Sequence, residues 1–153
     1  SQPDPAAGTA PASNEIPDSI SAEDVEAGTT ILNDFRAQAR TCGGTSYPAA
    51  APLTWNRQLY DAAKRHSDDM AQSKDIGHTG SDGSSPFDRI EDAGYTYSGA
   101  AENVAGKMNS LQVAFDGWVE SPGHCTNMMR DLVTQYGMAR TDGYWTLVLA
   151  APQ

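Results

Sequence analysis

The chain has 153 residues, a length suited to a single domain with its own hydrophobic core. Its formal net charge is −10 and its ten Lys and Arg residues are scattered, which argues against a nucleic-acid partner because phosphate binding needs clustered basic side chains. No run of about 18 apolar residues is present, so no membrane-spanning helix is predicted. The N-terminus lacks the basic-then-apolar layout of a signal peptide, and we expect that an exported form has already lost it.

Residues 1–20 differ in composition from the rest of the chain. They are mainly Pro, Ala, Ser and acidic residues with little to bury, which is the composition of a disordered tether. Such a stalk would space a domain from a wall or membrane anchor, and a plain flexible terminus has the same composition. We expect a disordered stalk over residues 1–20 and one folded domain over residues 21–153.

Four segments have the periodicity of amphipathic helices. Ser21, Asn56 and Ser85 stand where N-caps are expected, and Ser110 opens the fourth segment. The third segment has a proline in its first turn and Gly94 just past its end. The predicted helices run from about residue 22 to 40, from Asn56 to about Ser73, from Pro86 to Gly94, and from Ser110 to the Ser-Pro-Gly sequence at 121–123.

The last third of the chain changes to the pattern of strands. The segments VTQYGMAR and YWTLVLA are rich in β-branched and aromatic residues and are joined by Thr-Asp-Gly, which predicts an antiparallel hairpin. Helices followed by such a hairpin are typical of an α+β fold.

The Ser-Pro-Gly sequence at residues 121–123 interrupts the fourth helix just before a histidine. Proline resists continuation of a helix, and Gly123 permits backbone conformations closed to most residues. We therefore expect a sharp turn that aims His124, with Cys125 anchoring the same turn.

Two cysteines, Cys42 and Cys125, each follow a predicted helix. They are 83 positions apart, without the close C-x-x-C spacing of a zinc ribbon or a redox motif, which leaves one disulfide or two buried free thiols. A bridge across so long a loop would stabilise the fold by roughly 4 kcal/mol on the chain-entropy model. It would also restrain the segment that carries His124.

Several segments together resemble one family, the CAP superfamily of cysteine-rich secretory, antigen 5 and pathogenesis-related 1 proteins, in its bacterial secreted branch. The segments are ILNDFRAQAR, PLTWNRQLYDAAKRHSDDMA, IGHTGSDGSSPFDRIEDAGY, AENVAG, WVESPGHCTNMM and YGMAR...YWTLVLA. They occur in the family's order over roughly residues 25–152. The resemblance implies an α-β-α sandwich, with a three- or four-stranded antiparallel sheet between helices, and it favours the disulfide.

The resemblance also implies a groove in which two histidines and two acids converge. The matching residues are His78 in GHTGS, Glu102 in AENVA and His124 in SPGHC. Glu120 stands nearest to the fourth position, although it follows Trp118 by two residues where eukaryotic relatives have three. Neutral imidazoles with carboxylates suit zinc or copper, and a carboxylate beside a histidine can orient it as a base. We expect His78 and His124 as metal ligands, with zinc as the candidate ion.

Other polar residues have simpler interpretations. His66 shares a helix face with apolar residues, so we expect it in the core, and Asn33 and Arg36 are expected to form a hydrogen-bonding scaffold. The Ser-Asp-Asp run at 67–69 is interpreted as a solvated face. The loop at 78–86 carries oxygen ligands for calcium but lacks the spacing of an EF-hand. A carboxylate at Glu102 in an apolar segment requires a hydrogen-bonding partner.

Three classes of function remain. The first is a secreted, monomeric binding module that takes an extracellular lipid, peptide or wall fragment, with a divalent metal on the histidines. The second is a metal-dependent hydrolase, although neither G-x-S-x-G nor H-E-x-x-H occurs. The third is a structural wall protein with a vestigial groove. We rank binding first and hydrolysis second.

Overall fold

The computed structural model describes residues 13–153, and the part of the predicted stalk from residue 1 to 12 lies outside the described residues. The elements, in chain order, are α1 (Ala22–Arg36), β1 (Arg40–Cys42), β2 (Thr45–Tyr47), β3 (Thr54–Trp55), α2 (Arg57–Ser73), α3 (Pro86–Asp92), β4 (Tyr97–Ala105), α4 (Leu111–Glu120), α5 (Pro122–Met128), β5 (Gln135–Thr141) and β6 (Tyr144–Pro152). None of the helices in this part of the chain has the length and apolar character needed to cross a membrane.

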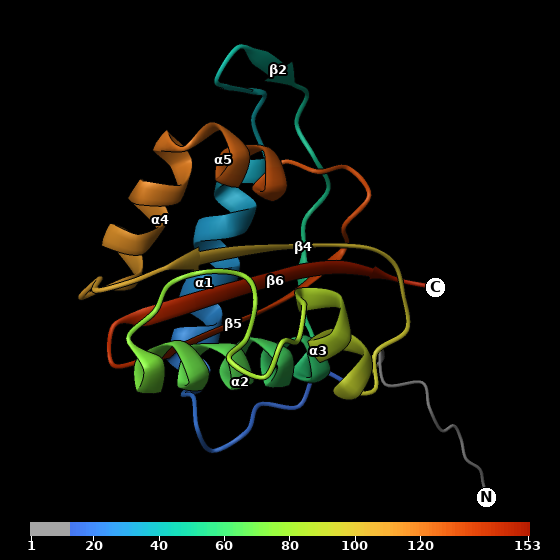
Figure 1. The fold of residues 1–153 in the computed structure, drawn as a ribbon. Helices are drawn as coiled ribbons and strands as arrows, with labels where there is room; N and C mark the ends of the chain where they lie inside the picture. The colour runs from blue at the N-terminus through green and yellow to red at the C-terminus, as the bar shows by residue number, and fades with distance from the viewer. Residues whose placement is uncertain (1–12) are drawn as a thin grey trace, which may run out of the picture.

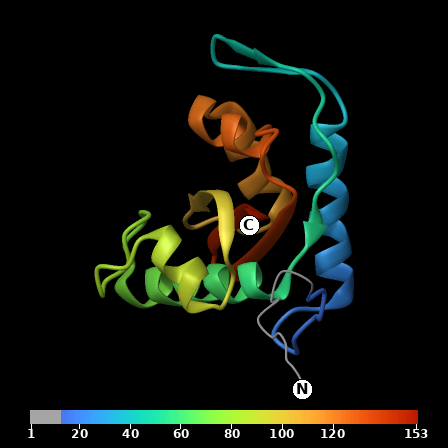
Figure 2. The same cartoon turned by 90° about the vertical axis from the view of Figure 1, so that its right-hand side faces the viewer.

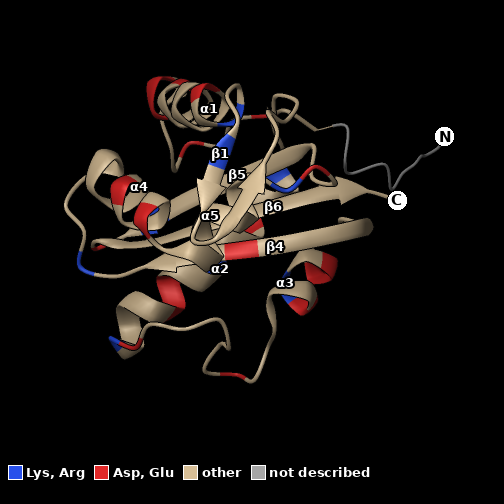
Figure 3. Ribbon diagram, turned by 90° about the horizontal axis from the view of Figure 1, so that it is seen from above, with Lys and Arg blue, Asp and Glu red and all other residues tan. Residues whose placement is uncertain are grey.

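Helices cover both faces of a four-stranded sheet (Figures 1 and 2). α1, α4 and α5 lie on one face, and α2 and α3 lie on the other. The strand order is β3-β5-β6-β4, and β1 and β2 form a separate two-stranded hairpin. Acidic and basic residues are spread over many elements of this sandwich (Figure 3). The predicted α-β-α sandwich of the α+β class is confirmed.

The sheet is antiparallel over β5, β6 and β4. The predicted hairpin is confirmed: Thr141 pairs with Tyr144, and the two residues between them have positive φ angles, 52° at Asp142 and 81° at Gly143. β3 pairs with β5 in parallel, so the sheet is mixed rather than wholly antiparallel. The long chain from α2 through α5 supplies the crossover that a parallel pair requires.

Residues 13–20, the end of the predicted stalk, contact the domain. The backbone N–H of Arg57 donates to the carbonyl of Ser13 (3.1 Å). The indole N–H of Trp55 donates to the carbonyl of Glu15 (3.2 Å). This stretch is therefore attached to the folded domain rather than free of it.

The first helix ends at Arg36, short of the residue 40 expected from periodicity. The guanidinium of Arg36 is fully buried and donates to backbone carbonyls, among them that of Met128 at the end of α5 (2.9 Å). Asn33 exchanges two hydrogen bonds with the backbone of Leu53 (3.0 and 2.7 Å). The prediction of a hydrogen-bonding scaffold is confirmed, and it ties α1 to the helix that carries His124.

The second helix approaches the sheet closely because β5 has a glycine beneath it. α2 begins after its Asn56 cap and ends at Ser73, as predicted. A Cβ atom on Gly137 would lie 2.1 Å from the backbone nitrogen of Tyr60 and 2.4 Å from the carbonyl carbon of Leu59. Only a residue without a side chain allows this contact between helix and strand.

The break after α4 is made by Ser121 and not by the glycine that follows. Ser121 has an extended backbone (φ −96°, ψ 121°), as expected for a residue before proline, and Pro122 then occupies the first turn of α5. The predicted break is confirmed, but Gly123 is helical and has no positive φ. His124 and Cys125 therefore lie in a new helix, where a turn was expected.

The predicted disulfide is confirmed. Cys42 in β1 and Cys125 in α5 are bridged, with their Cα atoms 5.5 Å apart, and no free cysteine remains among the described residues. Each cysteine lies in a regular element rather than in a loop. The bridge therefore attaches the β1–β2 hairpin to α5.

We expect Gly137→Ala to destabilise the protein strongly. The added methyl group would overlap the backbone of α2, which cannot rotate away, so the loss should reach about 3 kcal/mol, the upper range for overpacking. The matched control is Gly117→Ala on the exposed side of α4, where the new Cβ would have no atom within 4 Å apart from its chain neighbours and the backbone of its own helix. That change should stabilise α4 by up to about 1 kcal/mol. Urea unfolding followed by circular dichroism measures both, and equal stabilities would contradict the close contact.

Candidate functional site

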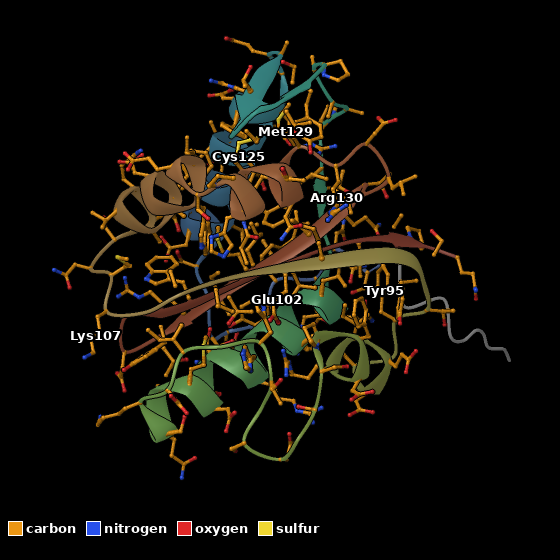
Figure 4. All side chains as sticks on the ribbon, turned by 45° about the horizontal axis from the view of Figure 1, so that its top comes forward. Tyr95, Glu102, Lys107, Cys125, Met129 and Arg130 are labelled. Carbon is orange, nitrogen blue, oxygen red and sulfur yellow. A yellow bond between two sulfur atoms is a disulfide. The ribbon has the colours of Figure 1, made fainter. Side chains whose placement is uncertain are left out.

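Two adjacent residues of strand β4, Glu102 and Asn103, hold the segments that carry the two histidines. Successive side chains of a strand point to opposite faces of the sheet. Glu102 points toward α3 and the loop before it, whereas Asn103 points toward α5, as their hydrogen-bonding partners show. In Figure 4, Glu102 lies in β4 between the helix that carries Cys125 and the elements of the opposite face. Both helical layers therefore meet the sheet at this point.

The carboxylate of Glu102 is buried and paired with an arginine. Its side chain is 1% exposed, and so is that of Arg89 in α3, whose Nη2 lies 2.8 Å from Glu102 Oε2. A buried carboxylate is costly unless it is charge-paired and hydrogen-bonded. The prediction that Glu102 needs a partner is confirmed. Sequence reasoning did not identify Arg89 as that partner.

The same carboxylate orients His78. Nδ1 of His78 donates to Glu102 Oε1 (2.9 Å), while the imidazole remains 49% exposed. Arg89 Nη2 also donates to the backbone carbonyl of His78 (2.8 Å), so it holds both the ring's partner and the loop. The hydrogen bond to Glu102 raises the pKa of His78 above its ordinary value, and partial burial opposes this shift. Nε2 of His78 has no hydrogen bond to residues 13–153 and is available to a ligand.

His124 reaches the same region from α5. Nδ2 of Asn103 donates to the backbone carbonyl of His124 (3.1 Å), and the neighbouring Cys125 is held by the disulfide. Burial lowers the pKa of the His124 imidazole, and the proximity of His78 lowers it further. His78 thus bonds to Glu102, and its electrostatic influence on His124 indicates that the two imidazoles lie near each other.

Glu120 does not join these three residues through any contact in the described part of the chain. It is exposed at the last position of α4, without a hydrogen bond or ion pair to His78, Glu102 or His124. Asn127, which sequence reasoning passed over, is closer to the site. Its Nδ2 donates to the Glu102 carbonyl (3.3 Å) and to Asn103 Oδ1 (2.9 Å).

The third histidine is structural, as predicted. His66 is 1% exposed on α2, its Nε2 contacts the carbonyl of Gly77, and burial lowers its pKa. The interpretation of residues 67–69 as a solvated face is wrong for Ser67. That side chain is fully buried, and its hydroxyl bonds to the carbonyl of Ala139 and the hydroxyl of Thr146. Ser67 lies next to His66 on the face of α2 that packs on the sheet.

The polar loop after α2 is held by hydrogen bonds and ion pairs with α2 and within itself. Asp69 accepts two hydrogen bonds from Ser81, and Asp82 accepts from the backbone of Ser84 and pairs with Arg65. Within residues 13–153, no group of three or more His, Cys, Asp and Glu side chains is arranged to hold a metal ion. Zinc prefers imidazole nitrogen ligands, and the expectation that His78 and His124 bind it stays a prediction.

A cavity of about 650 Å³ lies elsewhere. Its lining includes Ser21, Trp55, Tyr136 and Trp145 and contains neither His78 nor His124. The histidine site is defined here as His78, Glu102, His124 and Arg89, and none of these residues lines that cavity.

Comparison with known proteins places these features in a family. Residues 29–148 match the CAP model, described as the cysteine-rich secretory protein family. The uncharacterized membrane protein YlbC of Bacillus subtilis is 28% identical over 96 residues, which are 63% of this chain and 28% of YlbC. The chain spans about a third of the length of the curated relatives it matches.

Solved structures share the fold at low sequence identity. An extracellular protein with an SCP domain from Bacillus anthracis has a TM-score of 0.68 at 20% identity, covering 86% of this chain and 44% of that one. An outer surface protein from Borrelia burgdorferi has a TM-score of 0.70 at 18% identity, covering 86% of this chain and 95% of that one. NaASP2, solved with Zn²⁺, has a TM-score of 0.52 at 17% identity, covering 88% and 82%.

We expect Arg89→Met to cost roughly 3–5 kcal/mol of unfolding free energy, because it leaves the buried Glu102 carboxylate without its charged partner. The matched control is Arg65→Met on α2, which removes two ion pairs of an arginine that is 39% exposed. Exposed pairs of this kind contribute about 0–1 kcal/mol. Chemical denaturation measures both variants. A similar loss of unfolding free energy in the two variants would show that the buried pair contributes no more than an exposed one.

Proposed function

Because the chain belongs to the cysteine-rich secretory protein family, we propose that it is an extracellular binding module whose ligand site is formed by His78 and His124. One observation carries this proposal: the buried Glu102, neutralised by Arg89, orients an exposed imidazole beside a second one. Burying the Glu102–Arg89 pair carries a desolvation penalty, and an apolar pair would often stabilise a fold as well. A purely structural role therefore explains the pair poorly. Perturbed ionisable groups of this kind mark candidate functional sites.

An extracellular location is part of the proposal. The Cys42–Cys125 disulfide suits an oxidising compartment. Two structures with the same fold are described as an extracellular protein and an outer surface protein. These observations support export from the cell.

Zinc is the metal ion that the site suits best. The imidazoles of His78 and His124 would supply two nitrogen ligands, and Glu102 would hold His78 through Nδ1, the arrangement in which a carboxylate that does not touch the metal orients a metal-binding histidine. A bound ion would attract an anionic or carbonyl group of a ligand. With two protein ligands the remaining positions are open to water and to that ligand.

Hydrolysis is the second candidate. The His78–Glu102 hydrogen bond favours it, because a carboxylate on Nδ1 leaves Nε2 as the basic nitrogen. Peptidase assays with and without a chelator separate the two functions. Turnover that disappears in His78→Ala would select the enzyme.

We expect calorimetry to show zinc binding to the wild type at about pH 8, with the affinity at least about tenfold lower in His78→Ala and in His124→Ala. Binding should weaken at about pH 6, because zinc requires neutral imidazoles and the raised pKa of His78 keeps its ring protonated to a higher pH than an ordinary histidine. The control Glu120→Ala changes an exposed carboxylate and should bind as the wild type does. Equal affinity in all four proteins would refute the assignment.

A further inference from the structure

The outer edge of β4 presents backbone groups that the sheet does not use. β4 is the last strand in the order β3-β5-β6-β4 and pairs only with β6. The backbone carbonyl of Ala150 in β6 accepts a hydrogen bond from the backbone N–H of Thr134, next to β5. The backbone groups of Ala150 therefore face β5 and not β4. Its partner in β4 is Ala100. Because antiparallel pairs alternate between bonded and non-bonded, the N–H and C=O of Ala100 point outward, away from β6.

Two side chains confirm this orientation and cover the rest of the edge. Outward groups recur at every second residue, so the backbone groups of Glu102 and Val104 also point outward. Nδ2 of Asn127 donates to the carbonyl of Glu102 (3.3 Å), and the indole N–H of Trp118 donates to the carbonyl of Val104 (3.0 Å). The carbonyl and N–H of Ala100 have no such partner within residues 13–153. The edge is therefore open at Ala100 and closed from Glu102 onward.

Residues 99–101 themselves carry no lysine, proline or charge, and the register shift of the strand lies just before them, between Tyr97 and Gly99. Edge strands are normally guarded by lysine, proline or inward-pointing charge. Residues 98–101 read Ser-Gly-Ala-Ala, and Gly99, Ala100 and Ala101 are half-exposed. The nearest charge on the strand, Glu102, is buried under Arg89. Small side chains on both faces allow another backbone to approach to hydrogen-bonding distance.

We propose that the histidine site forms the end of a peptide-binding site, in which an extended polypeptide segment adds to the outer edge of β4 alongside Gly99–Ala101. Its backbone exchanges hydrogen bonds with the N–H and C=O of Ala100, in the mode known as strand addition. Asn127 stops the added strand at Glu102, next to His78 and His124. This inference rests on the proposed binding function and names its ligand class as an extended peptide.

Backbone complementarity is the reason for choosing a peptide. An outward N–H and C=O on one residue of an extended strand match the paired donor and acceptor of another extended chain. The hydrocarbon tail of a lipid offers neither a donor nor an acceptor. A second copy of the protein could pair through the same edge, and sedimentation decides this point: a dimer in which Ala100 is already protected would overturn the peptide in favour of the second copy.

The test uses amide hydrogen exchange by NMR on the whole chain. The probe is a mixture of capped hexapeptides built from Ala, Val, Thr and Ser, at about 5 mM in total, which detects weak binding. We expect exchange at the Ala100 amide to slow by at least about tenfold, while Ala101, already bonded to β6, changes little. The same mixture with N-methylated backbones is the control and should have no effect. Unchanged exchange at Ala100, or equal protection by the methylated peptides, overturns the proposal.

A pair of proline variants tests the geometry. Ala100→Pro removes an outward N–H that the sheet does not use, so the protein should keep its melting temperature while the peptide mixture no longer shifts the amide signals of the flanking residues Gly99 and Ala101. Ala101→Pro removes a bond to β6 and should lower the melting temperature. The opposite ranking of melting temperatures would overturn the orientation of Ala100.

Zinc calorimetry separates the peptide site from the proposed metal site. Zinc binding without protection of Ala100 by peptides refutes only the peptide site, and protection without zinc binding refutes only the metal site.

Discussion

The buried carboxylate of Glu102 is the interaction on which the site depends. A carboxylate at this depth cannot remain charged without compensation, and Arg89 and His78 provide it from α3 and from the loop before α3. One side chain thereby joins a strand, a helix and a loop. Arg89 also donates to the backbone carbonyl of His78, while Glu102 accepts from the His78 ring. Both members of the charge pair therefore hold the loop. The orientation of the exposed His78 ring follows from this buried pair.

The opposite face of β4 is held by neutral groups. Asn103 and Asn127 bond to each other and to the backbone of the strand and of α5, and the disulfide adds a covalent tie at Cys125. Arg36 binds the carbonyl at the end of the same helix. His124 is thus fixed through its backbone while its ring stays available, whereas His78 is fixed through its ring. The hydrogen bond to Glu102 raises the pKa of His78, whereas burial and the nearby His78 lower the pKa of His124.

The helices, the β5–β6 hairpin and the break between α4 and α5 were predictable because their sequence signals are local. Caps such as Asn56, a proline in a first turn and a strand period of two act within a few residues. The errors arose where a distant segment decides the outcome. Ser67 is polar, yet it is buried because Ala139 and Thr146 supply its partners from the sheet. Likewise, α1 ends where Arg36 turns to carbonyls far along the chain.

The sequence by itself determined the α+β class through local periodicity and the family through six short segments in order. The assignment of His78, Glu102 and His124 to a site came from the family resemblance and stays a prediction. Only the tertiary structure decided that Arg89 neutralises Glu102 and that Ala100 faces outward at the edge of the sheet. Both depend on which segments become neighbours and in what register. Such information is absent from local patterns because the free energy of a buried charge or an unpaired backbone group is set by the atoms packed around it.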